Sequence, residues 1–163
     1  AAEATSVGLF ALVPRLADAL DVPVVAAGGI ADGRGVAAAI ALGASAVQVG
    51  TALLRTPEVA IAPEWAAALD GLAPEATVTT RAYTGRLARA APTPYVTAWT
   101  APGAPSPAPY PHQRELVARM RRGEPGGLDR ANHWAGQSAA LATTDPAGEV
   151  VTRMWREARA LLG

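Results

Sequence analysis

Residues 22–33 read Val-Pro-Val-Val-Ala-Ala-Gly-Gly-Ile-Ala-Asp-Gly, and residues 44–51 read Ala-Ser-Ala-Val-Gln-Val-Gly-Thr. Each stretch begins with a short apolar run, which is typical of a parallel strand buried on both faces. Each then opens into a glycine turn, where the lack of a Cβ lets backbone N–H groups approach an anion closely. Two such turns on neighbouring parallel strands form the phosphate-binding arrangement that follows the last two strands of a β/α barrel. The pair therefore predicts an α/β fold with a phosphate site.

Helical patterns alternate with these two strands along the chain. Residues 14–20 have a proline near their start and an apolar side, which predicts a short helix before the first strand. Residues 35–42 predict a helix between the strands, and Gly43 stands where its cap is expected. The order helix, strand, helix, strand predicts parallel strands joined by right-handed crossovers.

The pattern loosens after Thr51. Residues 77–82 predict a short edge strand, and the proline- and alanine-rich residues 91–111 predict a long surface excursion. Further helices are expected at residues 63–72, 112–122 and 134–142, and in a last segment that Asp145 caps and Pro146 begins.

The length of the chain limits how much of a barrel it can hold. Its 163 residues suit one domain with a packed core, whereas a complete eight-stranded barrel typically needs about 250 residues. The sequence begins at Ala1, which favours a carboxyl-terminal portion, a processed product or a sequence without its upstream half. We therefore expect the carboxyl-terminal part of a TIM-type (β/α)8 barrel in residues 1–82. A loop-rich and then helical extension is expected in residues 83–163.

Composition excludes several classes of function. The chain carries 14 basic and 14 acidic side chains, so no net charge attracts it to nucleic acid or to an anionic membrane. The basic cluster in residues 114–122 contains no aromatic side chain and fits a solvated helix face. Cysteine is absent, which excludes disulfide scaffolds and thiolate chemistry. The two histidines, His112 and His133, have no acidic residues at ligand spacing, so no metal site is expected.

Nothing in the sequence predicts secretion or insertion into a membrane. The first residues lack the basic start of a signal peptide, and Gly43 and Gln48 interrupt the uncharged residues 35–54. We expect a cytoplasmic protein that acts on a small molecule and binds neither nucleic acid nor membrane. Because a partial barrel leaves strand edges open, we also expect self-association or association with a missing amino-terminal half.

Four segments carry a resemblance to a known family. Residues 24–35 and 41–52, around the two glycine turns, resemble the nitronate monooxygenases, flavin enzymes formerly called 2-nitropropane dioxygenases. The segments Tyr-Thr-Gly-Arg-Leu-Ala-Arg at residues 83–89 and Trp-Ala-Gly-Gln-Ser-Ala-Ala-Leu-Ala at residues 134–142 resemble later parts of that family, in the same order. The enoyl-acyl-carrier-protein reductase branch of the superfamily shares the glycine motif. The resemblance implies a β/α barrel that binds FMN at its carboxyl-terminal face.

The resemblance places the FMN contacts on Gly28, Gly29, Gln48, Gly50 and Thr51. Backbone N–H groups in these turns can donate to phosphate oxygens without a charged partner, and the Thr51 hydroxyl can add one more donor. A nearby helix amino end would further favour the dianion. The alternative is that the glycines only make tight turns between strand and helix.

For several other polar residues the sequence allows more than one role. Gln137 either contacts the flavin or substrate, or bonds to backbone at a helix end. His133 is a candidate for the rim of the pocket and for a replacement base. Arg86 and Arg89 either clasp an anionic group together, or Arg86 pairs with a local carboxylate. Asp32 is expected to accept a hydrogen bond as the cap of the following helix.

One departure from the family concerns catalysis. The resemblance implies a catalytic histidine in a Glu-Ala-Gly-Gly-His segment upstream of the first glycine turn, but residues 3–7 read Glu-Ala-Thr-Ser-Val. Alternatively, residues 5–8 are the far side of a missing loop, joined to Glu3-Ala4 across a deletion. Val7 cannot act as a base, so the catalytic residues stay unassigned and the chain is not assigned as an active enzyme. The expected function is FMN-dependent oxidation of alkyl nitronates by dioxygen. The alternatives are an enoyl-thioester reductase and a non-catalytic flavin-binding remnant.

Overall fold

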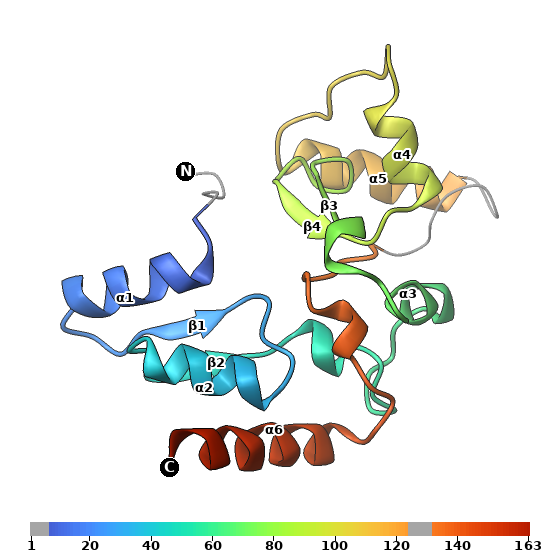
Figure 1. Cartoon of the computed structure of the whole chain (residues 1–163). Coiled ribbons are helices and arrows are strands. Elements are labelled where there is room, and N and C mark those ends of the chain that lie inside the picture. Colours follow the sequence, from blue (N-terminus) through green and yellow to red (C-terminus); the bar gives the residue numbers. More distant parts are fainter. Residues whose placement is uncertain (1–6, 124–131) are drawn as a thin grey trace.

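The structure is a computed structural model that describes residues 7–123 and 132–163 (Figure 1). Its elements are, in order, α1 (Leu9–Ala19), β1 (Val25–Ala27), α2 (Gly33–Ala41), β2 (Ala46–Gln48), η1 (Thr51–Leu53), α3 (Pro63–Ala68), η2 (Pro74–Ala76), β3 (Val78–Thr80), β4 (Ala88–Ala90), α4 (Pro94–Thr100), α5 (His112–Gly123), η3 (Ala139–Leu141) and α6 (Ala147–Leu162).

The two quoted stretches form a parallel pair. Strand β1 lies beside β2, with Val25 opposite Ala46 and Ala27 opposite Gln48. Helix α2 connects the strands, so the predicted order of helix, strand, helix and strand is confirmed. Because the pairing is parallel, both strands end at the same edge, and both glycine turns leave from that edge.

Helix α2 has the cap that its sequence predicts. The Asp32 side chain accepts a hydrogen bond from the Gly35 amide over 3.0 Å, as expected for an amino-terminal cap. At the other end Gly43 has a φ of +99°, a left-handed conformation that terminates helices at low cost for glycine.

The carboxyl-terminal helix α6 packs lengthwise against α2 (Figure 1). Buried side chains of α6 join those of α1, β1 and α2 in one core cluster: Val13, Ala26, Ile30, Val36, Ala37, Ala39, Ala44, Val150, Met154 and Ala158. The predicted start of α6 is wrong by one residue, because Pro146 is the cap and Ala147 begins the helix. The Asp145 carboxylate bonds instead to Thr143 and Arg153.

A second lobe is built on the antiparallel hairpin of β3 and β4. Its core is aromatic: Tyr83 stacks on Tyr95 at 5.4 Å and meets Trp134 edge-on at 5.1 Å. The prediction of a surface excursion over residues 91–111 is wrong in its first half. Helix α4 lies there, with Thr93 Oγ1 accepting from the Val96 amide, and its buried residues close this core.

Two helix predictions are corrected. Helix α1 begins at Leu9 rather than at residue 14, so Pro14 lies inside it and leaves the carbonyl of the exposed Phe10 without its helical donor. Residues 134–142 form no continuous helix and contain only η3. Instead, the backbone of this segment pairs with β4: Trp134 forms a bridge with Ala90, and the Ala135 amide donates to the Arg89 carbonyl.

The strands of the parallel pair are not buried on both faces. Val25 is 55% exposed and the adjacent Val22 is 63% exposed, whereas Ala26 is buried against the core. Helices α1 and α2 contact the strands on one face and α6 packs on α2, whereas Val25, Ala27, Ala46 and Gln48 are exposed. In the described residues no helix is long and apolar enough to cross a membrane.

Candidate functional site

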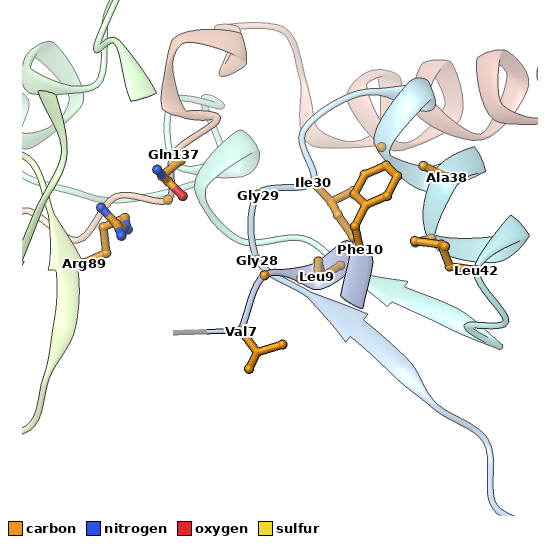
Figure 2. A pocket seen from close by; sticks show the side chains of 14 residues that line it. Val7, Leu9, Phe10, Gly28, Gly29, Ile30, Ala38, Leu42, Arg89 and Gln137 are labelled. Atoms are coloured by element: carbon orange, nitrogen blue, oxygen red, sulfur yellow. The ribbon is translucent and has the colours of Figure 1, made fainter. Parts of the chain in front are cut away.

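A cavity of about 470 Å³ opens beside the first glycine turn. Figure 2 shows Gly28 and Gly29 between two kinds of lining. Arg89 and Gln137 lie on one side of the turn, and the apolar side chains of Ile30 and its neighbours lie on the other. The cavity therefore has a polar end and an apolar end that meet at the glycines.

Backbone conformation explains the two glycines of the first turn. Gly28 has a φ of +105° and Gly29 a φ of +71°, which side chains with a Cβ rarely adopt. A Cβ at Gly29 would meet nothing within 4 Å, and one at Gly28 would meet only a Leu9 methyl group at 3.9 Å. Within the described chain, the backbone N–H groups of both residues have no hydrogen-bond partner. The turn thus has unbonded donors and room for a ligand beside it, which fits a bound phosphate.

The second glycine turn is tied to a distant segment. The Gly136 amide donates to the Thr51 hydroxyl over 3.0 Å. A Cβ at Gly136 would lie 3.4 Å from that hydroxyl oxygen and 3.9 Å from the Gly29 nitrogen. Three segments far apart in sequence therefore converge at one point. Because the Thr51 oxygen accepts this bond, its hydrogen stays available to a ligand.

Gln48 and Gly50 complete the predicted phosphate contacts. Gln48 is exposed at the end of β2, and Gly50 leads into η1 with nothing within 4 Å of its would-be Cβ. The structure brings Gly29, Thr51 and Gly136 together, and it places Gln48 and Gly50 next to Thr51 along the chain. Of the predicted contacts, only Gly28 and Gly29 line the cavity itself.

Arg89 contributes the charged lining of the cavity. It lies on β4, and its Nη1 donates to the Thr77 hydroxyl over 2.9 Å and to the Thr77 carbonyl over 3.4 Å. The sequence predicts either an anion clasp of Arg86 with Arg89 or the pairing of Arg86 with a local carboxylate. The structure separates the two, because the Arg86 guanidinium lies over the Tyr110 ring at 3.9 Å.

The other two predicted pocket residues are placed differently from each other. Gln137 is exposed and lines the polar end of the cavity. His133 is only 3% exposed, lies 6.4 Å from the Trp65 ring, and does not line the cavity. Its carbonyl accepts the Ala91 amide, which ties the segment to the end of β4.

The position expected for the catalytic histidine lies at the apolar end of the cavity. Val7 lines that end together with Leu9 and Phe10, and Figure 2 shows all three near the first turn. Residues 3–6 of the compared segment lie outside the described residues. Among the described residues, no cluster of three histidine, cysteine or acidic side chains could hold a metal ion.

Comparison with known sequences identifies relatives along almost the whole chain. A family model described as nitronate monooxygenase matches residues 1–157. The nitronate monooxygenase of Paraburkholderia phytofirmans is 43% identical over 155 residues, which cover 92% of this chain and 42% of that protein. The nitronate monooxygenase of Pseudomonas aeruginosa is 41% identical over 159 residues, which cover 94% of this chain and 44% of that protein.

Solved structures agree with the sequence matches and support the α/β fold. The nitroalkane oxidase of Streptomyces ansochromogenes superposes with a TM-score of 0.79 at 37% identity, over 96% of this chain and 46% of that one. FabK of Thermotoga maritima superposes with a TM-score of 0.77 at 34% identity, over 97% of this chain and 51% of that one. The chain thus spans less than half the length of the curated relatives described above.

Proposed function

The chain belongs to the nitronate monooxygenase family, and from this membership we propose that it binds FMN at its two glycine turns for the oxidation of an alkyl nitronate by dioxygen. The observation that carries the proposal is the open first turn. Its N–H groups at Gly28 and Gly29 have no hydrogen-bond partner in the described chain, and both residues line a cavity. Bound FMN would supply the electron transfer, and the protein would supply binding and orientation.

We propose that the phosphate is held by backbone rather than by a dedicated side chain. Gly28, Gly29 and Gly50 would donate through their amides, and the Thr51 hydroxyl would add a donor. Gln48, exposed at the end of β2, would contact the ribityl chain. Support for this arrangement comes from the convergence of Gly29, Thr51 and Gly136.

The architecture that we propose is the carboxyl-terminal part of a TIM-type barrel in residues 1–82, followed by a mostly helical extension in residues 83–163. The parallel pair of β1 and β2, with one face exposed at Val25, is what such a part would present. In a complete barrel that face would be covered by the strands of an amino-terminal half, on the same or another polypeptide. Self-association is the alternative way to cover it.

We further propose that the described residues bind flavin without supplying the catalytic base. Val7 lies where the family resemblance expects a histidine, and the buried His133 does not line the cavity. The substrate would be a small molecule in the cytoplasm, and neither nucleic acid nor membrane would be a partner. A non-catalytic flavin-binding remnant is the version of this proposal in which no base is supplied at all.

A second enzymatic function is favoured by one specific observation. The chain superposes on FabK of Thermotoga maritima almost as well as on the nitroalkane oxidase. An enoyl-thioester reductase would consume NAD(P)H in the presence of an enoyl thioester. A nitronate monooxygenase would instead consume dioxygen in the presence of an alkyl nitronate, so the two assays separate these functions.

The first test is the visible spectrum of the purified chain after incubation with FMN and desalting. We expect retained flavin bands, and we expect Gly50→Val to lose them. The structure makes this variant a fair test, because Gly50 has a φ of −120° and nothing within 4 Å of its would-be Cβ. Gly148→Val, on the equally open first turn of α6, is the control and should keep the flavin. A colourless wild-type chain would overturn the proposal.

A further inference from the structure

Among the described residues, Arg89 is the one charged residue in the lining of the cavity beside the glycine turns. The rest of that lining is glycine, apolar side chains and the neutral amide of Gln137. In Figure 2 the Arg89 guanidinium lies beside Gln137 on the polar side of the turn. A single cation in a neutral lining determines which charge a ligand must carry at that end.

Hydrogen bonds hold the Arg89 guanidinium through only one of its three nitrogens within the described chain. In the described chain its hydrogen bonds all use Nη1, which donates to the hydroxyl and carbonyl of Thr77. Thr77 is itself buried, and its hydroxyl donates to the Pro74 carbonyl over 2.7 Å. A fixed acceptor therefore orients the guanidinium, while Nη2 and Nε keep their donors for a ligand.

The backbone under Arg89 is connected directly to the second glycine turn. The Arg89 carbonyl accepts the Ala135 amide over 3.1 Å, and the next residue, Gly136, donates to Thr51. On its other side β4 pairs with β3, with Thr79 opposite Arg89. The pairing of β4 with β3 and the hydrogen bond from Ala135 thus fix the backbone of Arg89 relative to the turns.

No carboxylate neutralises this cation within the described residues. The ion pairs there join Arg34 to Asp32, Arg55 to Asp70 and Arg153 to Asp145. Arg89 is half-buried, and a half-buried charge without a counter-ion loses hydration that an anionic ligand can replace. The geometry therefore provides a cation with open donors next to a turn with open amides.

We propose that Arg89 pairs with the phosphate dianion of FMN and makes this chain select FMN over riboflavin. The inference rests on the proposed flavin function and adds to it a residue outside the two glycine turns. Amides alone leave the two negative charges of the phosphate without a counter-charge. Hydrogen bonds between a guanidinium and a phosphate are charge-assisted and stronger than neutral ones, so Arg89 contributes to FMN affinity and nothing to riboflavin affinity.

The test compares the dissociation constants of FMN and riboflavin by quenching of flavin fluorescence, using the full chain. Arg89→Gln should weaken FMN binding by about 10- to 100-fold, the range expected for loss of a charge-assisted hydrogen bond. Riboflavin binding should stay unchanged, and added salt should weaken FMN binding less in the variant than in the wild type. Arg86→Gln is the matched control, because Arg86 is a cation of the same hairpin that lies over Tyr110.

A second variant guards against loss of folding. Arg89→Lys keeps the charge but not the fork of donors, so FMN binding should fall by less than in Arg89→Gln while riboflavin binding is unchanged. The inference is overturned if the wild type binds FMN no better than riboflavin, if Arg89→Gln binds FMN like the wild type, or if the Arg89 variants weaken both flavins equally. The second result leaves the flavin proposal standing, whereas the first also removes its phosphate contacts. A wild-type chain that binds neither flavin overturns both.

Discussion

The backbone amide of Gly33 donates to the Glu157 carboxylate over 3.3 Å, although 124 positions separate the two residues. Gly33 is the last residue of the first glycine stretch and the first of α2, and Glu157 lies on α6. A carboxylate near a helix amino end interacts favourably with the helix dipole. The carboxyl-terminal helix therefore fixes the end of the proposed phosphate turn.

Gly33→Ala should destabilise the chain. An added Cβ would lie 2.3 Å from the Glu157 Cβ and 2.8 Å from the Ala158 nitrogen, so α6 must shift. Overpacking of this kind costs about 1–3 kcal/mol. Urea unfolding followed by circular dichroism measures the cost. Gly148→Ala is the control, since its Cβ meets nothing and the helix gains propensity; equal stability of the two variants would contradict the packing of α6 on α2.

Gly85→Ala should cost more than Gly103→Ala. The two glycines have nearly the same left-handed φ, +84° and +83°, so the conformational penalty of about 1 kcal/mol is shared. Only at Gly85 would a Cβ meet backbone, 2.3 Å from the Ala108 carbonyl oxygen. The difference between the two melting temperatures therefore isolates the close approach. Equal melting temperatures would mean that residues 108–110 do not lie against the hairpin.

Thr51→Val should loosen the connection between the second glycine turn and residue 136. Valine has the shape of threonine but leaves the Gly136 amide without its acceptor, at a cost of about 1–3 kcal/mol for an unsatisfied donor. Thr51→Ser keeps the oxygen and is the control. The free energy of unfolding and the amount of retained FMN should both fall in the valine variant and stay near wild type in the serine variant. A valine variant as stable as the serine one would count against this bond.

The free energy of unfolding should decrease as the pH is lowered, and protonation of Asp32 should account for part of the decrease. Burial alone would raise the pKa of Asp32, but hydrogen bonds from the Gly35 amide and the Arg34 guanidinium outweigh burial and hold the pKa below its ordinary value of 3.8. A carboxyl with a lower pKa in the folded chain stabilises the fold above its unfolded pKa, and this contribution is lost as the pH falls through the folded value.

Asp32→Asn tests this assignment. Asparagine keeps a cap acceptor but has no proton to gain, so its unfolding free energy should decline less than that of the wild type between about pH 5 and pH 2. Unfolding in urea at a series of pH values gives both curves. Parallel curves would show that the Asp32 carboxylate is not the titrating group.

Local chemistry explains which features the sequence could predict. The Asp32 cap and the Gly43 terminus depend on neighbours within four positions, and both are found where expected. The parallel pairing of β1 and β2 follows from the helix between them. The start of α4 had a similar local signal in Thr93 followed by Pro94, which the proline-rich composition around it obscured.

Features that depend on distant contacts could not be predicted in this way. The segment around Trp134 has a helical composition, but its backbone bonds to β4 and to Thr51 instead. Arg89 faces the cavity only because the hairpin places Thr77 behind it. Val25 is exposed because the described helices cover only one face of the strands, and strand propensity does not reveal which faces are covered.

The contacts of Trp134 have an optical consequence. Its carbonyl accepts the indole N–H of Trp65 over 3.0 Å. Both tryptophans therefore lie close to the segment whose Gly136 and Gln137 line the cavity. Flavins absorb at the wavelengths at which tryptophan emits. Resonance energy transfer to a flavin at the glycine turns would therefore quench the fluorescence of both tryptophans. The chain thus carries its own donor pair, and its ultraviolet emission can report flavin occupancy without any label.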